Sequence, residues 1–266
     1  MDEKSLKEWL DTKVEQYNQP AFIKDDPVGI PHRYTKQQDI EIAGFFAAIL
    51  AWGNRKSIIN SCDKLLGLMD NSPYDFIMNI DWHSESHSFS TFKKFVHRTF
   101  NETDLFHLLE FLRYHFGQKS EQSLETAFTQ WMLPGDETVE NALVGFHKYV
   151  FNFDDHAREE KHCRKHIATP SKKSACKRLN MFLRWMVRDD KKGVDFGLWK
   201  NISGSQLICP VDVHVSRVAK KLNLLTRHQN DWQSAMELTA CLRRFDNQDP
   251  VKYDFALFGL GVMEHY

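Results

Sequence analysis

Residues 210–222 read Pro-Val-Asp-Val-His-Val-Ser-Arg-Val-Ala-Lys-Lys-Leu, and this stretch predicts an α-helix with Asp212 at its N-terminus. The apolar side chains after the aspartate recur at three- and four-residue intervals, as they do along one face of a helix. Those side chains are Val215, Val218, Ala219 and Leu222. An aspartate in this position accepts hydrogen bonds from the free N–H groups of the first turn. The carboxylate of Asp212 is therefore either a simple helix cap or a rigid negative charge suited to stabilising a cationic transition state.

Helical spacing continues along most of the chain, and strict alternation of apolar and polar residues is almost absent. Residues 105–116, 124–132 and 139–153 each carry one apolar stripe. Residues 42–52 are apolar on nearly every side, which predicts a helix buried in the middle of its lobe and ending at Gly53. The sequence therefore predicts an all-α fold.

The composition changes most sharply near residues 153–155, and we expect a lobe boundary there. An N-terminal helical lobe would cover residues 1–154 and contain the buried helix 42–52, and a basic helical lobe would cover residues 155–266. One compact domain with mixed lobes is the alternative. A chain of 266 residues, 42% of them hydrophobic, is long and apolar enough to form either arrangement.

The cysteines and the apolar runs narrow the class of protein. The five cysteines are scattered without any Cys-x-x-Cys pair, which predicts free thiols in a reducing cytoplasm. The N-terminal residues are charged, and the longest apolar stretch, residues 42–52, is too short to span a bilayer. The group His156, His162, Cys163 and His166 matches no common zinc spacing. We therefore expect a soluble cytoplasmic protein with no metal, no cofactor and no membrane partner.

The formal net charge of −1 conceals two regions of opposite sign. Residues 156–228 hold 17 Lys and Arg and 6 Asp and Glu, a net charge of +11. The rest of the chain holds 18 basic and 30 acidic residues, which gives a net charge of −12. A basic region of this size is typical either of a surface that binds a polyanion or of solvated helix faces.

Within the basic region, residues 174–188 predict a helix with an apolar side and a cationic side. The apolar side holds Ala175, Leu179, Phe182, Leu183 and Met186, and the cationic side holds Lys173, Lys177, Arg184 and Arg188. The cationic side would face either solvent or, alternatively, a phosphate backbone or a cleft. Four aligned cations repel one another, which favours a site where a bound anion or a neutral lysine relieves the repulsion.

The segment around Asp212 resembles a known family. Pro210-Val211-Asp212-Val213-His214, followed by Arg217-Val218, resembles the Pro-Val-Asp-x-His-x-x-Arg-Val signature of the helix-hairpin-helix DNA glycosylase superfamily. This resemblance implies two helical lobes with a cleft between them and makes Asp212 the catalytic carboxylate. Lys177-Arg178-Leu179-Asn180 is similar to the helix that carries the nucleophilic lysine of archaeal 8-oxoguanine DNA glycosylases. Taken whole, the chain also resembles a bacterial family of conserved hypothetical proteins, and that resemblance names no activity.

Two features of the superfamily are missing from this sequence. Most members place the nucleophilic lysine in a Leu-Pro-Gly-Val-Gly-type hairpin about twenty residues before the aspartate, whereas this interval contains Lys192-Gly193 and no such hairpin. We therefore favour Lys177 as the nucleophile, with Lys192 and Lys173 as alternatives. No four-cysteine motif follows Cys241, and no iron–sulfur cluster is expected.

The resemblance implies a monomeric enzyme of base-excision repair that acts on duplex DNA. It would be a DNA glycosylase, and with a Schiff-base lysine also an AP lyase, for a damaged base such as 8-oxoguanine. The target nucleotide would be extruded into a pocket while cations hold the phosphates. The candidate DNA contacts in the basic region are Lys173, Arg178, Arg184, Arg188, His214, Arg217 and Lys221. The rival hypothesis is a non-catalytic DNA- or RNA-binding protein that retains the glycosylase fold.

The remaining candidates are aromatic residues and a loop. Residues 50–55, Leu-Ala-Trp-Gly-Asn-Arg, resemble the end of the first buried helix of endonuclease III-like enzymes and the loop after it that enters the DNA. Asn54 and Arg55 are therefore either plain loop residues or a wedge that fills the gap left by the extruded base. Trp52, Trp185 and Trp199 could stack on that base, although tryptophans at helical spacing are usually core residues.

Overall fold

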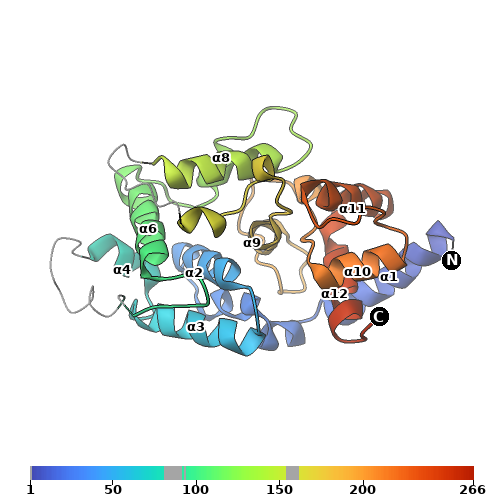
Figure 1. Cartoon of the computed structure of the whole chain (residues 1–266), viewed down its shortest axis with the longest axis horizontal. Helices are drawn as coiled ribbons and strands as arrows, with labels where there is room; N and C mark the ends of the chain where they lie inside the picture. Colours follow the sequence, from blue (N-terminus) through green and yellow to red (C-terminus); the bar gives the residue numbers. More distant parts are fainter. Residues whose placement is uncertain (1, 81–91, 93, 154–161) are drawn as a thin grey trace. The chain divides into compact units, whose positions relative to one another are not determined.

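The computed structural model describes residues 2–80, 92, 94–153 and 162–266, and its regular structure is helical (Figure 1). No β-strand occurs among these residues, where strand-like pairing is limited to isolated bridges between His97 and Phe100 and between Ser174 and Asp231. The predicted all-α class is thereby confirmed. Within the described ranges, no helix has the length and apolar character needed to cross a membrane.

The chain folds into two compact units, each assembled from segments that are distant in sequence. One unit consists of Met1–Lys24, Met132–Val144 and Ala168–Tyr266, and we call it the terminal unit because it contains both ends of the chain. The central unit consists of Asp25–Trp131 and Gly145–Ile167. Each unit therefore draws on residues from both sides of the composition change near residue 154.

Helices from both ends of the chain build the terminal unit. They are α1 (Glu3–Tyr17), α9 (Lys177–Val187), α10 (Val213–Lys221), α11 (Trp232–Phe245) and α12 (Tyr253–Val262). Short 3₁₀ turns connect them: η6 (Pro170–Lys172), η7 (Gly204–Gln206) and η8 (Pro250–Lys252). A further turn, η1 (Pro20–Asp25), lies where the chain passes from the terminal to the central unit.

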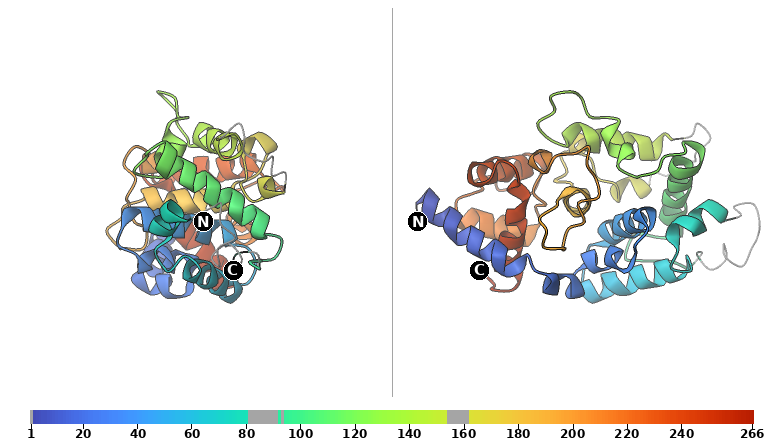
Figure 2. Two further views of the ribbon diagram at one scale, coloured as in Figure 1. Left: turned by 90° about the vertical axis from the view of Figure 1, so that its left-hand side faces the viewer. Right: turned by 180° about the vertical axis from the view of Figure 1, so that it is seen from behind.

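The apolar helix α12 organises the terminal unit by packing against both α1 and α10 (Figures 1 and 2). A methyl group at Gly259 would lie 2.2 Å from the Tyr17 ring on α1, and one at Gly261 would lie 3.1 Å from Cβ of His214 on α10. These two glycines therefore let the neighbouring helices approach the α12 backbone closely. The contact with α10 holds the helix whose first turn is capped by Asp212.

The central unit is built around α2 (Gln37–Leu50). Its other helices among the described residues are α3 (Arg55–Gly67), α4 (Pro73–Asn79), α6 (Glu102–Arg113), α7 (Thr126–Thr129) and α8 (Glu140–Phe151), and the first residues of α8 belong to the terminal unit. Short turns are η2 (Pro27–Gly29), η3 (Pro31–Arg33), the π-helical η4 (Tyr114–Gln118) and η5 (Cys163–Lys165).

Helix α2 is buried from Asp39 to Leu50 and contacts α3 and α4. It ends at Leu50, before the predicted end at Gly53. Its one charged residue in the deepest part, Glu41, accepts hydrogen bonds from Ser123 Oγ (2.6 Å) and the Leu124 N–H (2.8 Å). The buried carboxylate is thus hydrogen-bonded, as burial of a polar group requires.

Replacing Gly259 by alanine should destabilise the protein, because the added methyl would overlap the Tyr17 ring. We expect the free energy of unfolding to fall by about 1–3 kcal/mol, the usual cost of overpacking a filled core. Gly67→Ala in α3 is the matched control, since nothing lies within 4 Å of its added methyl and alanine is the better helix former. Equal urea denaturation midpoints for the two variants would contradict the packing described.

Candidate functional site

Asp212 is the N-cap of α10, as its position after proline predicts. Its Oδ1 accepts hydrogen bonds from the backbone N–H groups of His214 (2.8 Å) and Val215 (2.9 Å). Its second oxygen, Oδ2, lies 3.9 Å from Nζ of Lys177. One carboxylate oxygen is therefore held by the helix, and the other is turned towards an ammonium group.

Lys177 is the first residue of α9, directly after an irregular turn. Cys176 has a left-handed backbone with φ of 50°. The side-chain amide of Asn180 donates a hydrogen bond to the Ala175 carbonyl at 3.0 Å, which holds this turn against the helix. Besides Asp212, Nζ of Lys177 contacts Sδ of Met181 at 3.6 Å. The side chains of Lys177 and Asp212 are 28% and 22% exposed, so that solvent reaches the pair.

A network of buried ion pairs lies further along α9. Arg184 pairs with Asp195 (Nε to Oδ1, 3.3 Å) and with Asp254 of α12. Arg188 pairs with Asp190 at 2.7 Å, with Asp195 at 3.0 Å and with Asp249 at 2.8 Å. Both arginine side chains are only 4% exposed. Burying these cations is tolerable because each one is paired and hydrogen-bonded.

Asp254 links this network to the Lys177–Asp212 pair. Burial raises the pKa of the Asp254 carboxyl to about 6. Arg184 and Lys177 act against this rise in pKa, whereas the negative charge of Asp212 adds to it. The four groups therefore form one electrostatic unit, in which a change of charge at Asp254 is felt at Lys177 and Asp212.

The structure corrects the predicted roles of Arg184 and Arg188. Both were expected on a cationic face open to solvent or phosphate, but their guanidinium groups are buried against carboxylates. Helical spacing correctly places them on one side of α9, but it cannot reveal that Asp195, Asp249 and Asp254 cover that side. Neither arginine is available to a DNA backbone.

Two of the three tryptophans proposed to stack on a base are core residues. Trp185 is 0% and Trp199 1% exposed, and the Trp199 ring packs edge-on against Phe182 at 5.3 Å. The apolar surface of both rings is buried inside the terminal unit. The third, Trp52, is half-buried in the central unit, where the Arg98 guanidinium lies 5.0 Å from its ring.

The alternative lysines lie in different surroundings from Lys177. Lys192 forms an ion pair with Glu15 at 2.7 Å, and Lys173 is exposed in a left-handed conformation after η6. Arg178, next to Lys177, is half-buried, and burial lowers its pKa to about 10. Among these residues, the structure brings Lys177 to the carboxylate of Asp212.

The other candidates on α10 extend towards the C-terminal residues. Arg217 donates hydrogen bonds to the carbonyl oxygens of Gly261 (2.7 Å) and Tyr266 (3.2 Å). The ammonium group of Lys221 lies 5.1 Å from the centre of the Tyr266 ring. His214 is half-buried, with its Cβ facing Gly261 of α12. Arg217 and Lys221 keep exposed cationic surface in addition to these contacts.

Asn54 and Arg55 lie at the start of α3 in the central unit. Asn54 is the exposed N-cap, and its side chain accepts from the N–H groups of Lys56 (3.0 Å) and Ser57 (3.4 Å). Arg55 lies 3.9 Å from Asp26. The side chain of Asn54 thus caps α3. This structural role does not depend on whether Asn54 also acts as a wedge in DNA.

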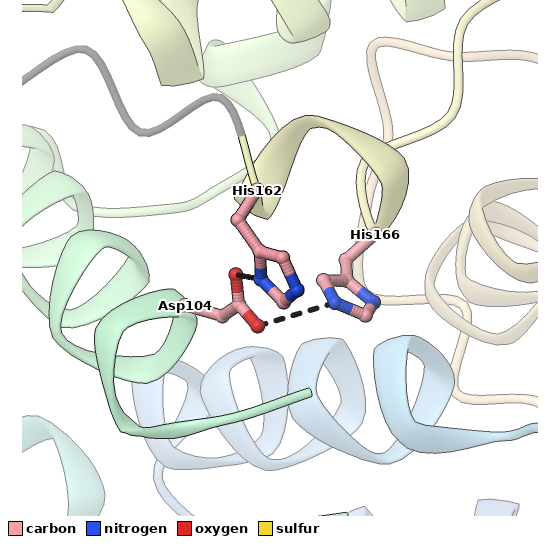
Figure 3. Close-up of side chains that lie close together, drawn as sticks. All are labelled: Asp104, His162 and His166. Atoms are coloured by element: carbon pink, nitrogen blue, oxygen red, sulfur yellow. Dashed lines mark hydrogen bonds and ion pairs between the residues drawn. The ribbon is translucent and has the colours of Figure 1, made fainter. Parts of the chain in front are cut away.

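A second polar cluster lies in the central unit and consists of Asp104, His162 and His166 (Figure 3). Oδ1 of Asp104 accepts from Nδ1 of His162 at 2.7 Å, and its Oδ2 lies 3.2 Å from Nε2 of His166. The Asp104 side chain is 0% and the His166 side chain 2% exposed, whereas that of His162 is 44% exposed. The ligand atoms of the three residues all lie within 4.8 Å of one another.

Sequence spacing could not reveal this cluster. Spacing along the chain instead groups His156, His162, Cys163 and His166, which are close in sequence. His156 lies outside the described residues, and Sγ of Cys163 is directed to the Asp104 carbonyl oxygen at 3.7 Å. The carboxylate comes from the start of α6, far from the histidines in the chain, and it meets them because η5 packs against α6.

Comparison with known proteins gives one match. Residues 26–263 match the model of a family described as protein of unknown function (DUF2400). The chain belongs to this family. No curated protein and no solved structure matches it. The DUF2400 match includes Lys177 and Asp212 as well as Asp104, His162 and His166, but the description of the family assigns no activity to them.

The raised pKa of Asp254 predicts an unusual pH dependence of stability. In the folded protein this carboxyl keeps its proton up to about pH 6, whereas the ordinary value is 3.8, so that folding takes up a proton between these values. The contribution of Asp254 to the free energy of unfolding is therefore highest below about pH 4 and falls as the pH rises. In Asp254→Asn this contribution disappears.

Urea unfolding of wild type and Asp254→Asn between pH 4 and pH 7 measures this effect. We expect the wild type to lose stability relative to the variant as the pH rises through the pKa of Asp254. A stability difference that stays constant, or that grows in favour of the wild type, would show that Asp254 does not titrate as the structure indicates.

Proposed function

We propose that this protein is a DNA glycosylase with AP-lyase activity, which removes a damaged base such as 8-oxoguanine from duplex DNA. The observation that carries the proposal is the distance of 3.9 Å between Nζ of Lys177 and Oδ2 of Asp212. A nucleophilic amine beside a fixed carboxylate is the pair of groups that the glycosylase resemblance requires. The two groups come from different helices, Lys177 from the start of α9 and Asp212 from the start of α10.

The carboxylate of Asp212 suits the first step, cleavage of the glycosidic bond. As the base departs with the bonding electrons, positive charge develops on the anomeric carbon of the sugar. A negative group that is already fixed near this carbon stabilises the charge without having to reorganise. Both N–H bonds to Oδ1 hold the Asp212 carboxylate in this way and leave Oδ2 to face the reacting groups.

Lys177 suits the second step, attack on the same carbon. Its neutral amine would form a bond to the anomeric carbon, and opening of the sugar ring would then give a Schiff base. The ammonium must first lose a proton, and Oδ2 of Asp212 is positioned to receive it once the 3.9 Å separation shortens on substrate binding. The proton then passes from Asp212 to the base anion released in the first step, which restores the negative charge of Asp212.

Exposed cations near the start of α9 suit the phosphate backbone. Lys172 and Lys173 are exposed directly before the turn that leads into Lys177, and Arg217 and Lys221 have exposed side chains on α10. Because Arg184 and Arg188 are neutralised by buried carboxylates, the basic surface is smaller than the sequence charge suggests. DNA affinity should therefore be salt-dependent with few phosphate contacts.

Borohydride trapping tests the lyase activity. Wild type is incubated with duplexes that carry 8-oxoguanine, uracil or an abasic site, and sodium borohydride reduces any Schiff base to a stable protein–DNA adduct. We expect an adduct for the wild type and none for Lys177→Ala. Lys192→Ala is the matched control and should give as much adduct as the wild type, because the ammonium group of Lys192 pairs with Glu15. DNA binding without base release or adduct formation would favour the non-catalytic DNA-binding hypothesis.

Asp212→Asn separates the catalytic charge from the helix cap. The asparagine side chain keeps an oxygen that accepts from the backbone of α10, but it loses the negative charge. We expect base release to slow by about 100-fold or more, with little change in the free energy of unfolding.

Asp212→Ala removes the cap as well and should lower the free energy of unfolding by about 1 kcal/mol. If Asp212→Asn releases base as fast as the wild type in single-turnover assays, Asp212 acts only as a cap and the proposed chemistry is wrong.

A further inference from the structure

We infer that Asp104, His162 and His166 form a binding site for a divalent transition-metal ion of the Zn²⁺ type. Two imidazoles and one carboxylate are a common ligand set for such ions, and with open positions they occur in catalytic sites. The inference rests on the central unit alone and is independent of the function proposed for Lys177 and Asp212.

The three ligand atoms are already close to the separations that a metal ion imposes. The Asp104 oxygens lie 2.7 Å from Nδ1 of His162 and 3.2 Å from Nε2 of His166, and all three ligand atoms lie within 4.8 Å of one another. Metal–ligand bonds of about 2.0–2.1 Å in a tetrahedral site place neighbouring ligand atoms about 3.3 Å apart. Small side-chain rotations that open the hydrogen bond between Asp104 and His162 would therefore admit the ion.

The backbone holds these ligands in place. Asp104 belongs to the capping box of α6, in which its Oδ2 accepts from the Asn101 N–H at 2.9 Å. The two histidines flank the single turn of η5, four residues apart, which brings their rings to one side. The contact from Cys163 Sγ to the Asp104 carbonyl fastens this turn to α6. The cluster is thus part of the fold and does not depend on flexible surface chains.

A cation close to the buried carboxylate of Asp104 would stabilise its negative charge. Its carboxylate accepts hydrogen bonds from the Asn101 N–H at 2.9 Å and from Nδ1 of His162 at 2.7 Å, and its side chain is 0% exposed. Within the described ranges, the ion pairs of this buried carboxylate are with the two imidazoles, and none is with a lysine or arginine. A bound metal ion would compensate the negative charge of this buried carboxylate.

The surroundings leave one side of the cluster open. His166 is packed against the rings of Phe100 (5.0 Å) and Trp52 (6.1 Å), while the His162 side chain is 44% exposed. An ion held by these three residues would therefore keep a coordination position for water or for an anionic ligand, as open zinc sites do. The solvent-exposed ring of His162 also provides the route of entry.

Lys165 is the group that competes with a metal ion. Its Nζ lies 2.6 Å from Nε2 of His162, so that the ammonium donates to that nitrogen and the ring proton faces Asp104 from Nδ1. When the ion binds Nδ1, this proton must move to Nε2 or be released, and the exposed Lys165 side chain must turn away. Lys165→Ala should therefore bind the metal several-fold more tightly than wild type.

Metal titration of the chelator-treated full-length protein tests the site. Zn²⁺ affinity is measured by calorimetry and by competition with a chromophoric chelator, and Co²⁺ is added separately to report coordination through its visible absorption. We expect one Zn²⁺ per chain and a Co²⁺ spectrum typical of a four- or five-coordinate site. Zn²⁺ should also raise the Tm.

The variants distinguish this site from adventitious binding. His162→Ala removes a largely exposed ligand and should weaken Zn²⁺ binding at least about 10-fold. Asp104→Asn keeps one oxygen that can accept from the Asn101 N–H in the capping box, and it should weaken Zn²⁺ binding similarly. His228→Ala, an exposed histidine of the terminal unit, is the control and should bind as wild type does. Absence of stoichiometric Zn²⁺ binding, or equal affinity in His162→Ala, would overturn the inference.

Discussion

The buried pairing of Arg184 and Arg188 with carboxylates is the constraint on which the terminal unit depends. A guanidinium group that is only 4% exposed must be paired, because an isolated buried charge is too costly. Asp254 of α12 and Asp195 and Asp249 of the connecting segments supply the partners, and together they fix the rotation of α9. Removing one member of such a buried pair typically costs about 3–5 kcal/mol.

This constraint also positions the candidate site. Lys177 begins the helix that the two arginines anchor, and Asp212 caps the helix that packs against α12. Because Asp254 of α12 pairs with Arg184 of α9, the elements that carry Lys177 and Asp212 are tied to the same buried network. The packing of these three helices therefore brings the amine and the carboxylate to the same part of the terminal unit.

Sequence reasoning succeeded where local spacing determines structure. The apolar period predicts the helical class, the burial of α2 and the start of α10, and the proline–aspartate order predicts the cap at Asp212. It failed where a distant segment decides the surroundings of a side chain. Arg184 and Arg188 look like a cationic surface until Asp195, Asp249 and Asp254 are placed over them. Trp185 and Trp199 likewise lie in the core, and Asp104 cannot be associated with His162 and His166 from spacing along the chain.

The two polar clusters share a form of construction. In each, an aspartate at the start of a helix is held through backbone N–H bonds, and its carboxylate oxygens face nitrogen atoms from another segment. The helix start supplies a rigid negative charge, and the partner nitrogens define the chemistry. Beside an amine, this charge suits the stabilisation of a cationic transition state, and beside imidazoles it suits a metal ion.

In the proposed reaction Lys177 is the nucleophile and works with Asp212. After borohydride reduction and proteolysis, mass spectrometry identifies the residue that has become joined to an abasic duplex. We expect the reduced sugar remnant to be attached to a peptide at Lys177. Attachment at Lys192 or Lys173, or the absence of any modified peptide from protein that binds the duplex, would contradict this role of Lys177.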